Sequence, residues 1–171
     1  MAATVPGLAI TEDYLLRLTR ANPGWQFERS SKGELLVSPT TSLNGPRNVA
    51  LSVQLSAWNA RSKFGKVFDS SSGFTMPDGA ILSPDGSCVR RDRWDALTPE
   101  QHDSYAPLCP DVCIEIASKT DSWAKVREKI ERYVVYGAQY ALAINPTTRQ
   151  TFELGSSPES LALDIDAIID A

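Results

Sequence analysis

The chain has 171 residues, of which 42% are hydrophobic and 22% are charged, and its formal net charge is −4 at pH 7. This composition is ordinary for a globular protein with a full core, so we expect one domain over residues 1–171. No apolar stretch approaches the ~20 residues of a membrane-spanning helix, and the first 13 residues lack the basic start and apolar core of a signal peptide. We therefore expect no membrane contact and a cytoplasmic location.

The cysteines and the single histidine exclude two further classes of protein. Cys88, Cys109 and Cys113 are odd in number and do not make a disulfide framework. With His102 as the only histidine, we expect no closed zinc site of four ligands. Reduced, buried thiols are expected instead, as in a cytoplasmic protein. His102 lies among polar residues and is predicted to be exposed rather than catalytic.

The first predicted element is a helix over residues 11–20. Thr11 is a suitable N-cap, and Glu12 and Asp13 favour the positive end of the helix dipole. Residues 1–24 are therefore expected to form a helical lead-in.

Strand and helix patterns alternate along the rest of the chain. The strand patterns are short apolar or alternating runs bounded by turn residues, at residues 25–29, 34–37, 65–69, 73–76, 80–83, 87–89, 112–117, 140–145 and 149–154. The helix patterns carry apolar residues at helical spacing or start and stop signals, at residues 46–63, within 91–105, and from 121 or 122 to 137. A loop is expected at residues 39–45 and an acidic tail at 156–171. This order predicts an α/β or α+β fold in which helices flank a mixed β-sheet.

One carboxylate, Glu115, lies in the middle of the apolar run at residues 112–117. Such a run, preceded by Pro110, is typical of a central strand that is buried on both faces. An ionised glutamate there is costly unless another group pairs with it or coordinates it. Cys113 and Ala117 share its face and are not surface-type residues. Glu115 is therefore the first candidate site residue, and the alternative is a solvated side chain on one wet face.

Metal chemistry needs a second carboxylate, and Asp85 is a better candidate than Asp111. Asp111 lies four residues before Glu115, which at ~3.3 Å per residue separates their backbones by roughly 13 Å. Carboxylates that share a divalent cation must each lie about 2.0–2.6 Å from it. Asp85 lies between the strand patterns at 80–83 and 87–89, which could pair beside Glu115. The alternative is that Asp85 belongs to an ordinary Pro-Asp-Gly turn.

Short motifs follow one another between Phe27 and Leu154 in a specific order. They are Gly33-Glu34-Leu35 with Ser38-Pro39, the run GKVFDS at 65–70, Ser83-Pro84-Asp85, Arg93-Trp94, Cys109-Pro110-Asp111, Ile114-Glu115-Ile116 with Ser118, and Glu128-Lys129 ahead of Tyr133 and Gly137. Together they resemble the Uma-type restriction-endonuclease family, within the PD-(D/E)xK nuclease superfamily. The resemblance covers about three quarters of the chain.

The resemblance implies a restriction-endonuclease-like fold and a metal-dependent endonuclease that hydrolyses DNA phosphodiester bonds. It implies Mg²⁺ or Mn²⁺ as cofactor, with Asp85 and Glu115 as metal ligands. Glu34 matches a recurring Gly-Glu of the family and is a further candidate catalytic residue; its alternative is a strand-edge glutamate facing water.

The lysine of the superfamily pattern is displaced in this chain. The pattern places it two residues after the acidic residue, where this chain has Ala117. The resemblance implies that Lys129, on the following helix, replaces it, and Lys119 is a weaker substitute. The alternative for Lys129 is a surface lysine whose stem covers the apolar stripe of its helix.

Two classes of function follow from these residues. The first is a DNA endonuclease, expected to be a homodimer if it cuts both strands. The second is a catalytically degenerate nuclease-fold protein that acts as a nucleic-acid-binding or protein-interaction module. The acidic net charge and Ala117 favour the module, whereas the joint presence of Asp85, Glu115 and Lys129 favours the nuclease.

Overall fold

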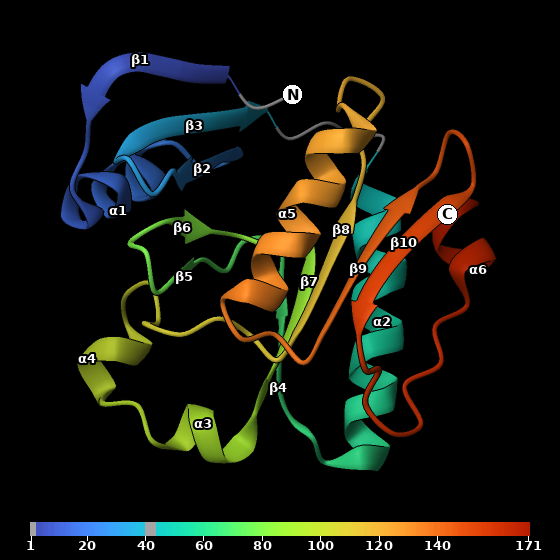
Figure 1. Cartoon of the computed structure of the whole chain (residues 1–171). Coiled ribbons are helices and arrows are strands. Elements are labelled where there is room, and N and C mark those ends of the chain that lie inside the picture. Colours follow the sequence, from blue (N-terminus) through green and yellow to red (C-terminus); the bar gives the residue numbers. More distant parts are fainter. Residues whose placement is uncertain (1–2, 40–43) are drawn as a thin grey trace.

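The computed structural model describes residues 3–39 and 44–171 (Figure 1). The strands are β1 (Ala3–Ala9), β2 (Trp25–Arg29), β3 (Glu34–Pro39), β4 (Gly65–Asp69), β5 (Phe74–Thr75), β6 (Ile81–Leu82), β7 (Gly86–Arg90), β8 (Val112–Ile116), β9 (Tyr140–Asn145) and β10 (Gln150–Gly155). The helices are α1 (Glu12–Ala21), α2 (Gly45–Ser62), α3 (Arg91–Asp95), α4 (Pro99–His102), α5 (Trp123–Val135) and α6 (Ile165–Ile169). The predicted loop at 39–45 falls partly outside the described residues, because 40–43 are not described.

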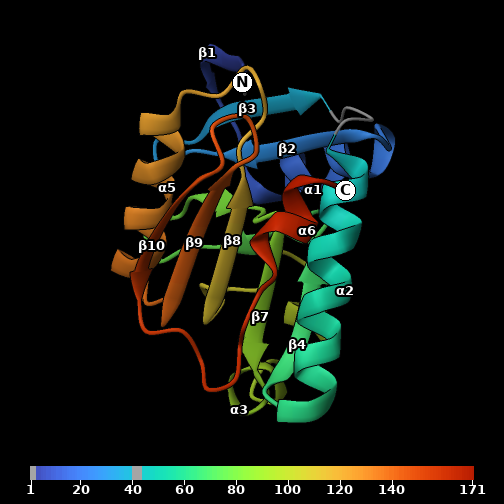
Figure 2. The ribbon, with the colours of Figure 1, turned by 90° about the vertical axis from the view of Figure 1, so that its right-hand side faces the viewer.

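The larger layer is a mixed sheet with the strand order β10-β9-β8-β7-β4. β8 and β9 run parallel, and the other neighbouring strands of this sheet run antiparallel. Figures 1 and 2 show α5 on one face of the sheet and α2 with α6 on the other. This arrangement confirms the predicted fold class, a mixed sheet flanked by helices.

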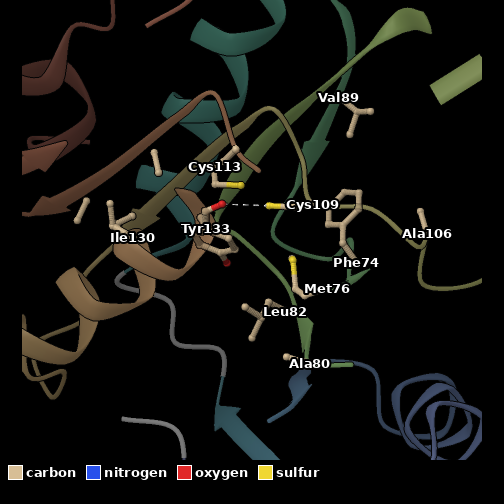
Figure 3. Packing of buried hydrophobic residues seen from close by; sticks show 13 residues of the cluster. Phe74, Met76, Ala80, Leu82, Val89, Ala106, Cys109, Cys113, Ile130 and Tyr133 are labelled. Atoms are coloured by element: carbon tan, nitrogen blue, oxygen red, sulfur yellow. Dashed lines mark hydrogen bonds between the residues drawn. The ribbon is translucent and has the colours of Figure 1, made fainter. Parts of the chain in front are cut away.

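The central strand β8 separates two hydrophobic cores. Every residue of β8 is buried, as predicted for a strand covered on both faces. Val112, Ile114 and Ile116 pack against Leu51, Leu55 and Trp58 of α2, whereas Cys113 belongs to the core with Ile130 and Tyr133 of α5 (Figure 3). Since side chains alternate along a strand, Glu115 is directed to the α5 face.

The smaller sheet has the order β1-β3-β2-β6-β5 and carries α1. Its first strand corrects the prediction that residues 1–24 form only a helical lead-in, because β1 precedes α1. Pro6 and Gly7 interrupt the strand pattern of this segment. The β1–β3 register is irregular between Val5 and Ala9, where these two residues lie.

The link between the two sheets corrects a second expectation. Of the strand patterns on either side of Asp85, only β7 pairs with β8. β6 pairs with β2 and β5 in the smaller sheet. Asp85 therefore lies where the chain passes from one sheet to the other, immediately before β7.

The remaining elements agree closely with the predicted ones. The consecutive strands β2 and β3, and likewise β9 and β10, pair as antiparallel hairpins. Thr11 caps α1 by accepting a hydrogen bond from the Tyr14 N–H. Gly137, with φ +105°, follows the end of α5 as expected. Ser122 begins α5 without a side-chain cap. The acidic tail contains α6, whose Ile168 and Ile169 are buried in the core that α2 covers.

The cysteines confirm the prediction of free, buried thiols. Burial raises the pKa of Cys88 to about 12 and holds the pKa of Cys113 well above its ordinary value. These thiols are therefore not nucleophiles. Among the described residues, no helix has the length and apolarity needed to cross a membrane.

The close contact between α2 and the start of β7 depends on Gly86. A Cβ at this position would lie 2.7 Å from Cδ2 of Leu51 and 3.0 Å from Cδ1 of Leu55. We expect Gly86→Ala to lower the free energy of unfolding by about 1–3 kcal/mol, because overpacking moves α2 away from the sheet. Urea denaturation followed by circular dichroism would measure this. Gly45→Ala is the control, because its Cβ meets no described atom within 4 Å; equal stability of the two variants would contradict the prediction.

Candidate active site

Glu115 is buried on the α5 face of β8, with 8% of its surface exposed. Two donors from α5 reach the same carboxylate oxygen, Oε1. The Tyr133 hydroxyl donates to it at 2.7 Å, and the Lys129 Nζ lies 2.8 Å from it. The other oxygen, Oε2, has no hydrogen-bond partner among the residues that the structure describes.

Lys129 points toward the carboxylates of Glu115 and Glu28, in keeping with the position that the family resemblance implied. It lies one helical turn before Tyr133, so both side chains leave α5 on the same side. Its ammonium also contacts Oε1 of Glu28 at 3.0 Å. Burial alone would lower the pKa of Lys129, but the carboxylates of Glu115 and Glu28 raise it above its ordinary value. The ammonium is therefore charged at neutral pH.

Asp85 reaches β8 from the link that precedes β7. Its Oδ2 accepts a hydrogen bond of 2.7 Å from the backbone N–H of Ile116, the residue after Glu115. Its Oδ1 has no hydrogen-bond partner in the described part of the chain. Asp85 thus reaches β8 from the link before β7, and Asp85 and Glu115 each keep one oxygen that no described residue engages.

A cavity of about 560 Å³ contains these groups. Asp85, Glu115 and Lys129 line it together with Glu28, a residue that the sequence analysis missed. Glu28 comes from β2 of the smaller sheet, and its Oε1 also accepts from the Ser83 N–H at 2.7 Å. A glutamate two residues after Gln26 marks one face of a strand. This alternation is the only local sign that Glu28 faces the same side as Gln26, and it does not show that Glu28 meets Lys129 on the helix of the other sheet.

The other residues weighed from the sequence do not join this group of side chains. Glu34 is not among its lining residues, and its carboxylate accepts a hydrogen bond from the Ser30 hydroxyl within the same hairpin. Asp111 accepts from the Arg90 N–H and pairs with Arg93, so it serves a separate contact, as the spacing predicted. His102 is exposed and stacks on Trp94. Lys119 lines the cavity, but no contact joins it to the carboxylates among the described residues.

Negative charge exceeds positive charge at the centre of the cavity. Burial raises the pKa of Asp85 to about 6, and nearby Glu28 adds to the rise against the opposing effects of the Ile116 N–H and Lys129. Burial also raises the pKa of Glu115, with Asp85 and Glu28 adding to the rise and Lys129 opposing it. The pKa of Tyr133 lies well above its ordinary value because of burial and the Glu115 charge, so its hydroxyl remains a donor.

The donor set fits a hard divalent cation. Described side chains do not form a ready-made group of three metal ligands. However, Mg²⁺ is commonly held by only one or two carboxylates and completes its shell with water and phosphate oxygens. The unengaged oxygens of Asp85 and Glu115 supply this kind of pair, and an added cation would offset the local excess of negative charge.

The sequence of this chain matches the model of the family Uma2, described as "Putative restriction endonuclease", over residues 11–160. The chain belongs to the Uma2 family. Its fold is similar to the crystal structure of a protein from Anabaena variabilis ATCC 29413, titled a "putative nuclease belonging to DUF820". The TM-score is 0.67 at 18% sequence identity, and the match covers 94% of this chain and 98% of that one. No curated protein matches this Uma2 chain.

The buried charge of Asp85 makes a testable prediction about stability. Folding raises its pKa from 3.8 to about 6, so the wild-type protein loses stability as pH rises through that window. Asp85→Asn keeps an acceptor for the Ile116 N–H but cannot ionise. Because this carboxylate is partly exposed, we expect the metal-free variant to be more stable than wild type by only about 1–2 kcal/mol at pH 8.

The gain should disappear near pH 4, where the carboxyl of the wild-type protein is protonated in the native state. Urea denaturation in EDTA at both pH values would measure it. Asp95→Asn is the matched control, because Asp95 is exposed. A gain of the same size at both pH values, or none at pH 8, would contradict this account of Asp85.

Proposed function

We propose that this Uma2 chain is a metal-dependent endonuclease that hydrolyses DNA phosphodiester bonds in the 560 Å³ cavity. The observation that supports this proposal most directly is the charged Lys129 ammonium, which lies 2.8 Å from Glu115 in the same cavity as Asp85. Family membership supports the nuclease assignment. The superfamily lysine position holds Ala117, and Lys129 brings an ammonium to the acidic pair from α5 instead.

Asp85 and Glu115 would hold Mg²⁺ or Mn²⁺ through the oxygens that no described residue engages. When bound, such a cation lowers the pKa of a coordinated water and neutralises charge on the phosphate. Tyr133 fixes the orientation of Glu115 by donating to Oε1. The Ile116 N–H similarly fixes Asp85 by donating to Oδ2, so both carboxylates are positioned before substrate arrives.

Lys129 would supply fixed positive charge next to the reacting phosphate. Its contacts with Glu115 and Glu28 hold the ammonium in place. A preoriented charge of this kind stabilises the negative charge that develops on phosphate oxygens in the transition state. Glu28 acts through Lys129 and is a positioning residue in this scheme.

DNA is the proposed partner in spite of the net charge of −4. Lys119, Lys125 and Arg132 line the same cavity as the acidic pair. Their charges can engage backbone phosphates locally, although the whole chain is acidic. A homodimer remains a prediction that depends on cleavage of both strands of a duplex.

Replacing Glu115 tests the acidic pair. We expect Glu115→Gln to abolish Mg²⁺-dependent DNA cleavage while the fold is retained, because the amide keeps the shape and loses the charge that holds the cation. Gel assays with Mg²⁺, Mn²⁺ or EDTA would measure cleavage, and circular dichroism would check the fold. Glu131→Gln, on the exposed side of α5, is the control. Metal-independent DNA binding without cleavage would decide instead for the binding module.

Replacing Lys129 separates charge stabilisation from metal binding. We expect Lys129→Ala to lower the cleavage rate roughly 100-fold, with Mn²⁺ binding by calorimetry retained, because no metal ligand is lost. Lys66→Ala removes an exposed lysine of β4 and should change neither quantity. Wild-type cleavage rates in Lys129→Ala would show that Lys129 is only a structural ion-pair partner.

A further inference from the structure

A second hollow of about 950 Å³ meets the active-site cavity at Asp85. We call it the α2–β2 groove, because these two elements contribute nine of its 19 described lining residues. The groove and the cavity share four lining residues: Gln26, Asn44, Ser83 and Asp85. A polymer whose scissile group lies at Asp85 can therefore extend into both hollows.

The α2–β2 groove contains exposed apolar side chains. Trp25 on β2 is 50% exposed, and Val49 and Val53 on α2 are 63% and 61% exposed. The two valines are four residues apart and lie on one side of the helix. Apolar side chains of this size are seldom left in water without cause when they gather in one hollow.

Among the described residues, the polar lining of the groove has no basic side chain, and its charged members are Asp69 and Asp85. Neither lysine nor arginine occurs among its described lining residues, which carry amide and hydroxyl groups such as those of Gln26, Asn48 and Ser52. The Oδ1 atoms of Asn44 and Asn48 are buried without a hydrogen-bond partner among the described residues. The active-site cavity differs, because Lys119, Lys125 and Arg132 line it.

We propose that the α2–β2 groove binds the bases of unpaired nucleotides of DNA, while the backbone phosphates lie along Lys119, Lys125 and Arg132 of the active-site cavity. This inference rests on the proposed nuclease function. Bases have apolar faces that stack on an aromatic ring such as Trp25, and their edges carry donors and acceptors for amide and hydroxyl groups. The continuity of the two hollows supports this occupant, as do Lys119, Lys125 and Arg132, whose positive charges line the cavity.

An intact duplex cannot place its bases in the groove and its phosphates in the cavity in this way. Its bases are stacked inside and present only their edges, so a protein surface meets mainly phosphates and sugars. Stacking on Trp25 requires a base that has left its stack. The preferred substrate is therefore single-stranded DNA or the unpaired arm of a branched duplex.

Binding of fluorescent oligodeoxynucleotides to the full chain in EDTA tests the groove without cleavage. The probes are a 20-nucleotide thymidine strand, a blunt duplex and a duplex with splayed arms. We expect the strand and the splayed duplex to bind at least tenfold more tightly than the blunt duplex. Base stacking on an aromatic ring changes Kd roughly 5- to 100-fold, so Trp25→Ala should weaken only the probes with unpaired bases. Tyr14→Ala, an exposed aromatic residue outside both hollows, is the control.

A second pair of variants covers the case that Trp25→Ala fails to fold. Val53→Asp places a negative charge in the groove and should weaken binding of the thymidine strand at least fivefold. Val135→Asp makes the same change at an exposed valine outside both hollows and should not. Equal binding of all three probes, or equal effects of each variant and its control, would overturn the inference.

Cleavage assays with Mg²⁺ or Mn²⁺ separate this inference from the proposed function. Metal-dependent cleavage of the blunt duplex as fast as of the splayed one, with no effect of Trp25→Ala, overturns the groove assignment and leaves the nuclease intact. If no substrate is cleaved, the nuclease proposal fails. Trp25-dependent binding in EDTA would then still support the groove as a site for unpaired bases.

Discussion

The burial of a carboxylate on the central strand is the constraint on which the site depends. Glu115 lies within an otherwise apolar strand, where an unpaired charge would cost several kcal/mol. α5 compensates for this charge with an ammonium and a hydroxyl, both directed at Oε1. The position of α5 on the sheet is therefore set by polar contacts as well as by its apolar stripe.

Lys129, which supplies this ammonium, also connects the two sheets. Lys129 on the helix of the larger sheet contacts Glu28 of the smaller sheet, and Glu28 also accepts from the Ser83 N–H in the link that leads to Asp85. Each carboxylate of the site thus comes from a different segment: β2, the link before β7, and β8. Because all three line one cavity, that cavity depends on both sheets and on the link between them.

This arrangement of buried charges contributes little to the stability of the fold, but it suits the binding of a cation. Glu115 and Glu28 share one ammonium, and burial raises the pKa values of Asp85 and Glu115, with neighbouring carboxylates adding to each rise. A buried ion pair is weak grounds for assuming a stabilising role. Perturbed carboxylates that keep unengaged oxygens in a cavity are instead typical of sites that receive a cation.

The sequence predicted the elements of the fold well and the pairing between distant ones less well. Local patterns identified β8, its buried glutamate and α5, because apolar periodicity depends on neighbouring residues. The Lys129 ammonium contacts Glu115, in keeping with the position that the family resemblance implied for it. By contrast, Pro6 and Gly7 concealed β1, and no local signal shows that β6 joins β2 rather than β8. The same limit concealed Glu28, because its role depends on a lysine about a hundred residues later in the chain.

Continuity between the active-site cavity and the α2–β2 groove extends this picture from the reacting group to the substrate. Basic side chains line the cavity beside its carboxylates, whereas the described lining of the groove has none and contains Trp25 with exposed valines. They meet at Asp85, where the proposed cation would lie. In the proposed mode of binding, the fold separates recognition of the backbone from recognition of the bases at the point of cleavage.

The central claim is that Asp85 and Glu115 together hold the cation. A crystal of the protein soaked with Mn²⁺ and measured near the manganese absorption edge tests it directly. The account predicts one anomalous peak within about 2.0–2.6 Å of a carboxylate oxygen of each residue. A peak elsewhere, or none while Mn²⁺ supports cleavage in solution, would contradict it.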